Sequence, residues 1–274
     1  MTERATGRPV EARTAVAPAR YERPNVVTFI LYVAIVAFLI WSFEGAGWSF
    51  SQLGSGLPAL GDFLARAWPP SLDRFDRIGG AVLETFQMAL VGTVVGVALS
   101  LPLGILAARG LAGRWVNAAT RGLIALFRTV PDLVWALIFV ITVGLGPFAG
   151  TLAIVVDTIG FCGRFFAEAM EDVDKGPQEA LTAVGASRVD TIFCTVVPAA
   201  MPAFVTTALF ALEKSTRSSV VLGLVGAGGI GLELKVAMDL FDYPTAMTII
   251  LLIFVLVLAV ERFGAALRQR ILAN

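Results

Sequence analysis

Six long apolar runs, nearly free of charged side chains, restrict what this sequence can fold into. Each run approaches the roughly 20 residues that a helix needs to cross the hydrocarbon core of a bilayer. Only 15% of the residues are charged, whereas a soluble domain carries roughly 25%. The sequence therefore predicts an all-α, polytopic membrane helix bundle of about six transmembrane helices, at residues 26–43, 79–108, 123–143, 148–166, 196–219 and 243–260.

Basic side chains predict the orientation of these helices. Arginine and lysine gather in alternate connections, and such clusters stay on the cytoplasmic side of a membrane. We therefore expect both termini in the cytoplasm. The expected organisation is a disordered basic tail at 1–25, a first transmembrane helix with an external loop at 26–78, a transmembrane core at 79–265 and a cytoplasmic tail at 266–274. The clusters outside the N-terminal tail are Arg109, Arg114 and Arg121; Arg164, Lys175 and Arg188; and Arg262, Arg268 and Arg270.

Several function classes are disfavoured by composition. The 21 basic and 21 acidic residues cancel, so no global field attracts nucleic acid. The chain has no histidine, which removes the commonest metal ligand and the usual acid or base near neutral pH. No metal or cofactor is expected. Cys162 and Cys194 are far apart, and we expect both to be small buried hydrophobic residues.

The external loop and the second apolar run carry structural signals. Leucines and Phe63 between residues 53 and 64 form an amphipathic stretch that ends at the break Trp68-Pro69-Pro70. This stretch is expected to lie along the membrane interface or to form an ordered cap. Small residues recur every four positions in the second run and predict close helix packing; they are Gly92, Gly96, Ser100 and Gly104.

The connection between the fourth and fifth runs, residues 168–198, is the most informative segment. Gly176-Pro177 predicts a stop and restart, and residues 178–184 can form a short helix that ends at Gly185. A short helix, a glycine turn and a second amphipathic piece make a rigid projection on the cytoplasmic side. Such a projection suits docking into a groove of a partner.

The same segment resembles the EAA loop of ATP-binding-cassette importer permeases. Glu179, Ala180, Gly185 and Pro198 match that motif in register, whereas Leu181, Thr195 and Val197 depart from it. The resemblance implies that this loop is the coupling helix, which sits in a cleft of a cytoplasmic ATPase. No G-x-x-x-x-G-K-[ST] pattern occurs in the sequence, so we expect the ATPase to be a separate subunit and this chain to be a transport subunit without an ATPase site.

Further stretches resemble the phosphonate-uptake permeases, at residues 84–88, 101–104, 128–136, 144–150 and 223–231. This resemblance implies the fold of a type I importer permease in the plasma membrane of a prokaryote. It also implies import of phosphonate or a related oxyanion such as phosphate or phosphite. The implied partners are two ATPase subunits, an external substrate-binding protein, membrane lipid and a second permease copy, as a homodimer or with a sister permease.

Charged and hydroxyl side chains within the fifth run are candidates for the translocation path. They are Glu213, Lys214, Thr216, Arg217 and Ser218. Charges at such depth usually face a cavity or a partner. Either Glu213 and Arg217 form a structural pair at i, i+4, or Lys214 or Arg217 offers hydrogen bonds to a passing oxyanion. Asp132 and Asp157 present a similar choice between helix-end capping and path lining, and we favour the structural role.

Gly226, Gly228, Gly229 and Gly231 include a G-x-G-x-x-G match, but no strand precedes it, so a dinucleotide site is not expected. These glycines are predicted to break a helix at the outer mouth and to act as a gate. An ion-coupled secondary transporter for a small anion is the alternative function, although no inverted repeats are apparent. A membrane enzyme is disfavoured because no acid/base constellation is present.

Overall fold

A computed structural model describes residues 25–272, and the chain divides into two compact units, Met1–Leu60 and Gly61–Asn274. The predicted basic tail lies outside the described residues except for Asn25. In the first unit, α1 (Val26–Gly45) is apolar on every side and none of its side chains is buried. A helix of this kind suits a lipid environment. The amphipathic stretch forms α2 (Phe50–Ala67), which ends before Trp68 as expected.

The second unit is built on four long helices, α3 (Phe75–Ala107), α6 (Pro147–Glu171), α9 (Val197–Gly223) and α11 (Tyr243–Leu272). The predicted small-residue stripe of α3 lies against α6. A Cβ atom on Gly96 would lie 2.5 Å from Cβ of Thr158, and one on Gly92 would lie 2.6 Å from Cγ2 of Ile154. The predicted role of the stripe in close helix packing is confirmed.

The third predicted span is broken into two helices. Residues 123–143 were expected to form one helix, but α4 (Arg114–Thr129) and α5 (Asp132–Val143) meet at a bend of 90°. Pro131 lacks an N–H and disfavours the helical conformation at the preceding residue, and Val130 is extended, with ψ 122°. The described residues thus hold five helices long and apolar enough to cross a membrane, or six if this bent pair is counted as one span.

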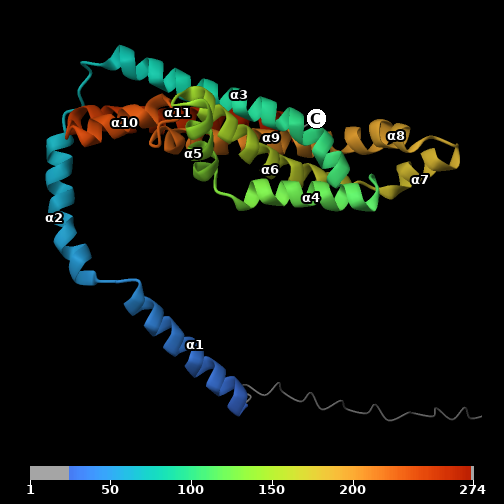
Figure 1. The fold of residues 1–274 in the computed structure, drawn as a ribbon, viewed down its shortest axis with the longest axis horizontal. Coiled ribbons are helices and arrows are strands. Elements are labelled where there is room, and N and C mark those ends of the chain that lie inside the picture. The colour runs from blue at the N-terminus through green and yellow to red at the C-terminus, as the bar shows by residue number, and fades with distance from the viewer. Residues whose placement is uncertain (1–24, 273–274) are drawn as a thin grey trace, which may run out of the picture. The chain divides into compact units, whose positions relative to one another are not determined.

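Short elements complete the second unit. They are α7 (Lys175–Ala183), α8 (Arg188–Thr191), the π-helix η1 (Ile192–Val196) and α10 (Gly229–Asp239). Helices α7 and α8 lie at one end of the bundle, beyond α4, and α10 lies towards the opposite end (Figure 1). Residues 266–272, expected as a tail, continue α11 as helix.

The two cysteines differ in burial. Cys162 is fully buried beside Phe166 and Phe204, as expected. The expectation for Cys194 is wrong, because this residue lies on η1 and is exposed. Its apolar neighbours in the sequence include Phe193, which is 58% exposed. An apolar sequence context therefore does not identify a buried position in a segment that leaves the bundle.

Candidate functional site

In the coupling segment, residues 168–198, the last turn of α6 is followed by a well-capped short helix. A carboxylate oxygen of Asp174 accepts a hydrogen bond of 3.1 Å from the backbone N–H of Gly176. Helix α7 therefore starts at Lys175, and Gly176 and Pro177 lie in its first turn, so the predicted stop and restart there is wrong. Proline is tolerated in a first turn because its missing N–H would have no helical partner.

Gly185 ends this helix in the left-handed region, with φ +85°. Its N–H donates to the carbonyl of Thr182, and the N–H of Ala186 donates to the carbonyl of Leu181, each over 3.0 Å. These bonds satisfy carbonyls at the helix end. A Cβ atom at Gly185 would meet no atom within 4 Å. The position therefore requires glycine for its backbone conformation and not for space.

A capping box starts the next element. Oγ of Ser187 accepts from the N–H of Asp190, and the carboxylate of Asp190 accepts from the N–H of Ser187. This reciprocal pair satisfies two donors at the start of α8. The coupling segment therefore has a defined turn between two helices, as the sequence predicted.

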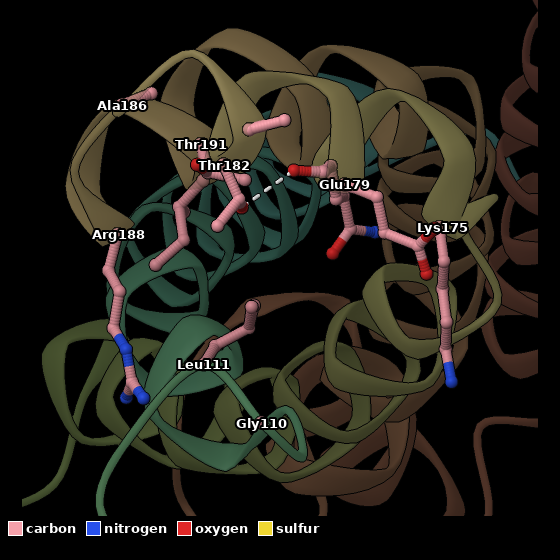
Figure 2. Close-up of a pocket in the computed structure, with 11 residues that line it drawn as sticks. Gly110, Leu111, Lys175, Glu179, Thr182, Ala186, Arg188 and Thr191 are labelled. Atoms are coloured by element: carbon pink, nitrogen blue, oxygen red, sulfur yellow. Dashed lines mark hydrogen bonds between the residues drawn. The ribbon is translucent and has the colours of Figure 1, made fainter.

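Glu179 lies at a cavity of about 520 Å³ beside α7. Figure 2 shows Lys175 and Glu179 on one side of the cavity, Arg188 on another, and Leu111 across from α7. The dashed line is the 2.8 Å hydrogen bond from Oγ1 of Thr182 to the carbonyl of Gln178. Ala180 is exposed on α7, and Pro198 is exposed in the first turn of α9. Gly110 and Leu111 also line this cavity; no motif in the sequence indicated them.

Within the fifth run, the predicted pair of Glu213 and Arg217 is not formed. Glu213 is 7% exposed and pairs instead with Arg268 of α11, over 2.8 Å. Gly264 of α11 lies against this carboxylate: a Cβ atom on Gly264 would lie 2.5 Å from Oε1 of Glu213. The small residue leaves room for the carboxylate between the helices. Arg217 is exposed and makes no ion pair with any of residues 25–272.

Lys214 is paired across the α6–α9 interface. Its Nζ lies 2.7 and 2.8 Å from the two carboxylate oxygens of Asp157 and 5.2 Å from the ring centre of Phe161. The Lys214 side chain is still 41% exposed, against 16% for Asp157. Asp157 is thus the counterion of Lys214 and caps no helix end. The hydroxyl of Thr216 is buried and donates to the carbonyl of Leu212, whereas Ser218 is partly exposed.

The glycine-rich segment, residues 226–231, joins the end of α9 to the start of α10 and breaks the helix between them. Gly226, Gly228 and Gly229 all have positive φ, between 72° and 91°. Oε1 of Glu84 accepts from the N–H of Gly229 over 2.9 Å, and Oγ1 of Thr85 accepts from that of Ile230 over 2.7 Å. A side chain at Gly231 would collide with the carbonyl of Val220. The predicted helix break is present, and the sequence had assigned no role to the two α3 side chains that cap it.

Asp132 lies at the start of α5, where its carboxylate accepts a 2.9 Å hydrogen bond from the N–H of Leu133. This contact fits the helix-end role favoured for it. The two aspartates therefore have different roles: Asp132 stabilises a helix start, and Asp157 is the counterion of Lys214.

Comparison with known proteins agrees with this architecture. Residues 100–273 match the family described as binding-protein-dependent transport system inner membrane component. A putative phosphite transport system permease protein of Stutzerimonas stutzeri, HtxC, is 38% identical over 244 residues, which cover 89% of this chain and 85% of that protein. The phosphate-import permease protein PhnE of Mycolicibacterium smegmatis is 39% identical over 222 residues, covering 78% of this chain and 40% of that protein.

Among solved structures, an inward-facing conformation of the MetNI methionine ABC transporter is similar in fold. The TM-score is 0.64 at 23% sequence identity, over 73% of this chain and 99% of that chain. At that identity the likeness shows the fold alone, which is the predicted fold of a type I importer permease.

Proposed function

Because this chain belongs to the family of binding-protein-dependent transport system inner membrane components, we propose that it is the membrane-spanning permease subunit of an ATP-driven importer for phosphonate, phosphate or phosphite. The family match covers most of the chain, and the two relatives above are named for phosphite and for phosphate. An ion-coupled secondary transporter does not fit a family whose members depend on a binding protein.

The coupling segment is the proposed contact with the ATPase. The observation that carries this assignment is the capped α7, closed at Gly185 and followed by the capping box of α8, at one end of the bundle (Figure 1). Glu179 and Ala180 are exposed on it. A separate ATPase subunit on each permease copy would receive this projection, and the binding protein would dock at the opposite end.

The membrane orientation follows from this contact. The coupling segment, both termini and the arginine clusters lie on the cytoplasmic side of a prokaryotic plasma membrane, and Ser55 lies outside. A second permease copy, identical or a sister chain, completes the path. This arrangement leaves α1 and the apolar faces of the bundle to membrane lipid.

Lys214, Arg217 and Ser218 are the proposed donors along the path. Lys214 is held by Asp157 yet 41% exposed, so its charge is compensated at rest and its ammonium can still be reached. An oxyanion that passes would share this ammonium with Asp157. Glu213 and Thr216, which are buried and bonded within the bundle, would support the helix and not contact cargo. Gly226, Gly228, Gly229 and Gly231 form the proposed gate.

The coupling assignment is tested by ATP hydrolysis in the reconstituted complex of permease, ATPase and binding protein. Phosphite-loaded binding protein is expected to stimulate hydrolysis, and Glu179→Ala is expected to reduce both this stimulation and co-purification of the ATPase. Glu261→Ala, an exposed acidic residue on α11, is the matched control. Equal stimulation and co-purification in the Glu179 variant would overturn the assignment.

A further inference from the structure

A second charged cavity lies between α4 and α6, and the path described above does not include it. Its volume is about 370 Å³, and its apolar wall includes Ile124 and Ala167. Four guanidinium groups and two carboxylates line it, which leaves a formal charge of +2. These residues are Arg109, Arg121, Arg128, Arg164, Glu168 and Glu171.

Two glycines of α6 allow α4 to approach closely beside this cavity. A Cβ atom on Gly160 would lie 3.0 Å from the backbone N of Arg128, and one on Gly163 would lie 3.2 Å from Cδ1 of Ile124. The two helix backbones can approach this closely because neither glycine carries a side chain. Arg164 follows Gly160 by one helical turn, and both Arg164 of α6 and Arg128 of α4 line the cavity.

Among residues 25–272, only two of the four guanidinium groups have a carboxylate partner. Glu171 pairs with Arg121 and also accepts from the backbone N–H of Arg109 over 2.7 Å. Glu168 pairs with Arg164 over 2.6 Å. The side chains of Arg109 and Arg128 are exposed and form no ion pair with any of residues 25–272. Within the described part of the chain, the cavity therefore presents two guanidinium groups that no carboxylate compensates.

Two residues that line the cavity share a face of α6 with Asp157, the partner of Lys214. Asp157, Arg164 and Glu168 are separated by seven and four residues, so they lie on one face of α6. Arg164 is about 10 Å along the helix from Asp157, at 1.5 Å per residue. It lies on the side of Asp157 towards Glu171, where α6 ends within the coupling segment.

We propose that this cavity is an inner binding site for a phosphorus oxyanion, occupied after the anion leaves Lys214, with Arg109 and Arg128 as its principal ligands. The inference rests on the proposed function, because it takes the imported anion as the occupant. Planar guanidinium groups match the several oxygens of such an anion. Arg128 lies in the last turn of α4, where a cation also stabilises the helix end, so the test separates a structural role from that of a ligand. A phospholipid headgroup offers the same chemistry, so the test separates the two sources.

The test measures equilibrium binding of radiolabelled inorganic phosphate to the permease–ATPase complex in detergent, without binding protein. Arg128→Gln is expected to weaken binding about tenfold, the loss of one hydrogen bond to a charged group, and Arg128→Lys is expected to lose less. Arg114→Gln is the matched control, because Arg114 is exposed on the same helix and outside this cavity. The abundance of each complex shows that the variants fold.

Glu168→Gln is expected to change phosphate binding in the opposite direction. It releases Arg164 from its partner, so phosphate binding is expected to tighten. A purely structural cluster predicts unchanged or weaker binding after this change. Unchanged phosphate binding in both Arg128→Gln and Glu168→Gln would overturn the proposal.

A lipid arm identifies the source of the anion. The complex is placed in vesicles of phosphatidylcholine, with and without phosphatidylglycerol. Phosphate binding that depends on Arg128 in both vesicles supports the proposal. Loss of that binding when phosphatidylglycerol is present, with Arg128-dependent retention of this lipid, assigns the cavity to a lipid headgroup and overturns the proposal.

Two further results separate this inference from the proposed function. Wild-type uptake by Arg128→Gln with unchanged phosphate binding defeats only this inference. Failure of the unaltered complex to import any phosphorus oxyanion defeats the proposed function.

Discussion

Glu213 lies one turn before Arg217 on α9, yet its carboxylate pairs with Arg268 from α11. The guanidinium of Arg268 also lies 4.2 Å from the ring centre of Phe210. Lys214 likewise takes its partner from another helix, at Asp157. Spacing along one helix predicts only i, i+4 pairs. The candidate residues could be predicted because they are charged within an apolar run. Their partners could not, because both lie more than fifty residues away in the sequence.

The pairing of Glu213 predicts which arginine stabilises the protein. Arg268→Gln leaves a buried carboxylate without its partner and is expected to cost about 3 to 5 kcal/mol. Arg217→Gln, at an exposed position without an ion pair to any of residues 25–272, is expected to leave stability unchanged. Thermal unfolding of the purified complex and its abundance in membranes measure both effects.

The double variant Glu213→Gln with Arg268→Gln removes both charges and is expected to recover most of the stability. Loss of stability in Arg217→Gln equal to that in Arg268→Gln would contradict the observed pairing.

Gly185 gives a second prediction for a single residue. Because its φ is +85° and the space around it is open, Gly185→Val is expected to strain the turn by at least about 1 to 2 kcal/mol. Gly185→Asn is the control, since asparagine adopts this conformation more readily. Co-purification of the ATPase is expected to fall about tenfold for valine and little for asparagine. Equal losses in the two variants would show that the turn's conformation is not what docking requires.

At the scale of helices, the apolar runs predicted where most elements lie, and the glycine turn predicted the end of α7. The break between α4 and α5 was missed although Pro131 marks it, because apolar residues resume after Asp132 and the two stretches together have the length of one span. Apolar character reports burial in lipid or protein and does not report helix continuity. The capping of α10 by Glu84 and Thr85 was also beyond sequence reasoning, since it joins positions 145 residues apart.

The contact between α3 and α6 yields a prediction for packing. Gly96→Ala places a methyl group 2.5 Å from Cβ of Thr158 and is expected to destabilise the bundle by about 1 to 3 kcal/mol. Gly80→Ala, on the same helix with open space around it, is the matched control. Membrane abundance and the unfolding temperature report the difference. Equal behaviour of the two variants would show that close contact at Gly96 is not required.

At the scale of the whole molecule, the exposed Cys194 and the buried Cys162 allow the orientation to be tested without introduced cysteines. A membrane-impermeant thiol reagent is expected to label the unaltered chain in inside-out vesicles and not in intact cells. Cys194→Ser is expected to abolish this labelling, and Cys162→Ser is expected to leave it unchanged. Labelling of Cys194 from outside intact cells would reverse the assigned orientation.

ATP-dependent uptake by proteoliposomes that contain the permease, its ATPase and its binding protein tests the central claim most directly. Labelled phosphite, phosphate and a phosphonate are supplied outside, with ATP inside. We expect uptake of at least one of these anions, which stops when ATP is omitted and falls in the Glu179→Ala complex. Uptake that persists without ATP and disappears when ion gradients are dissipated, or uptake of methionine with none of the three anions, would contradict the assignment.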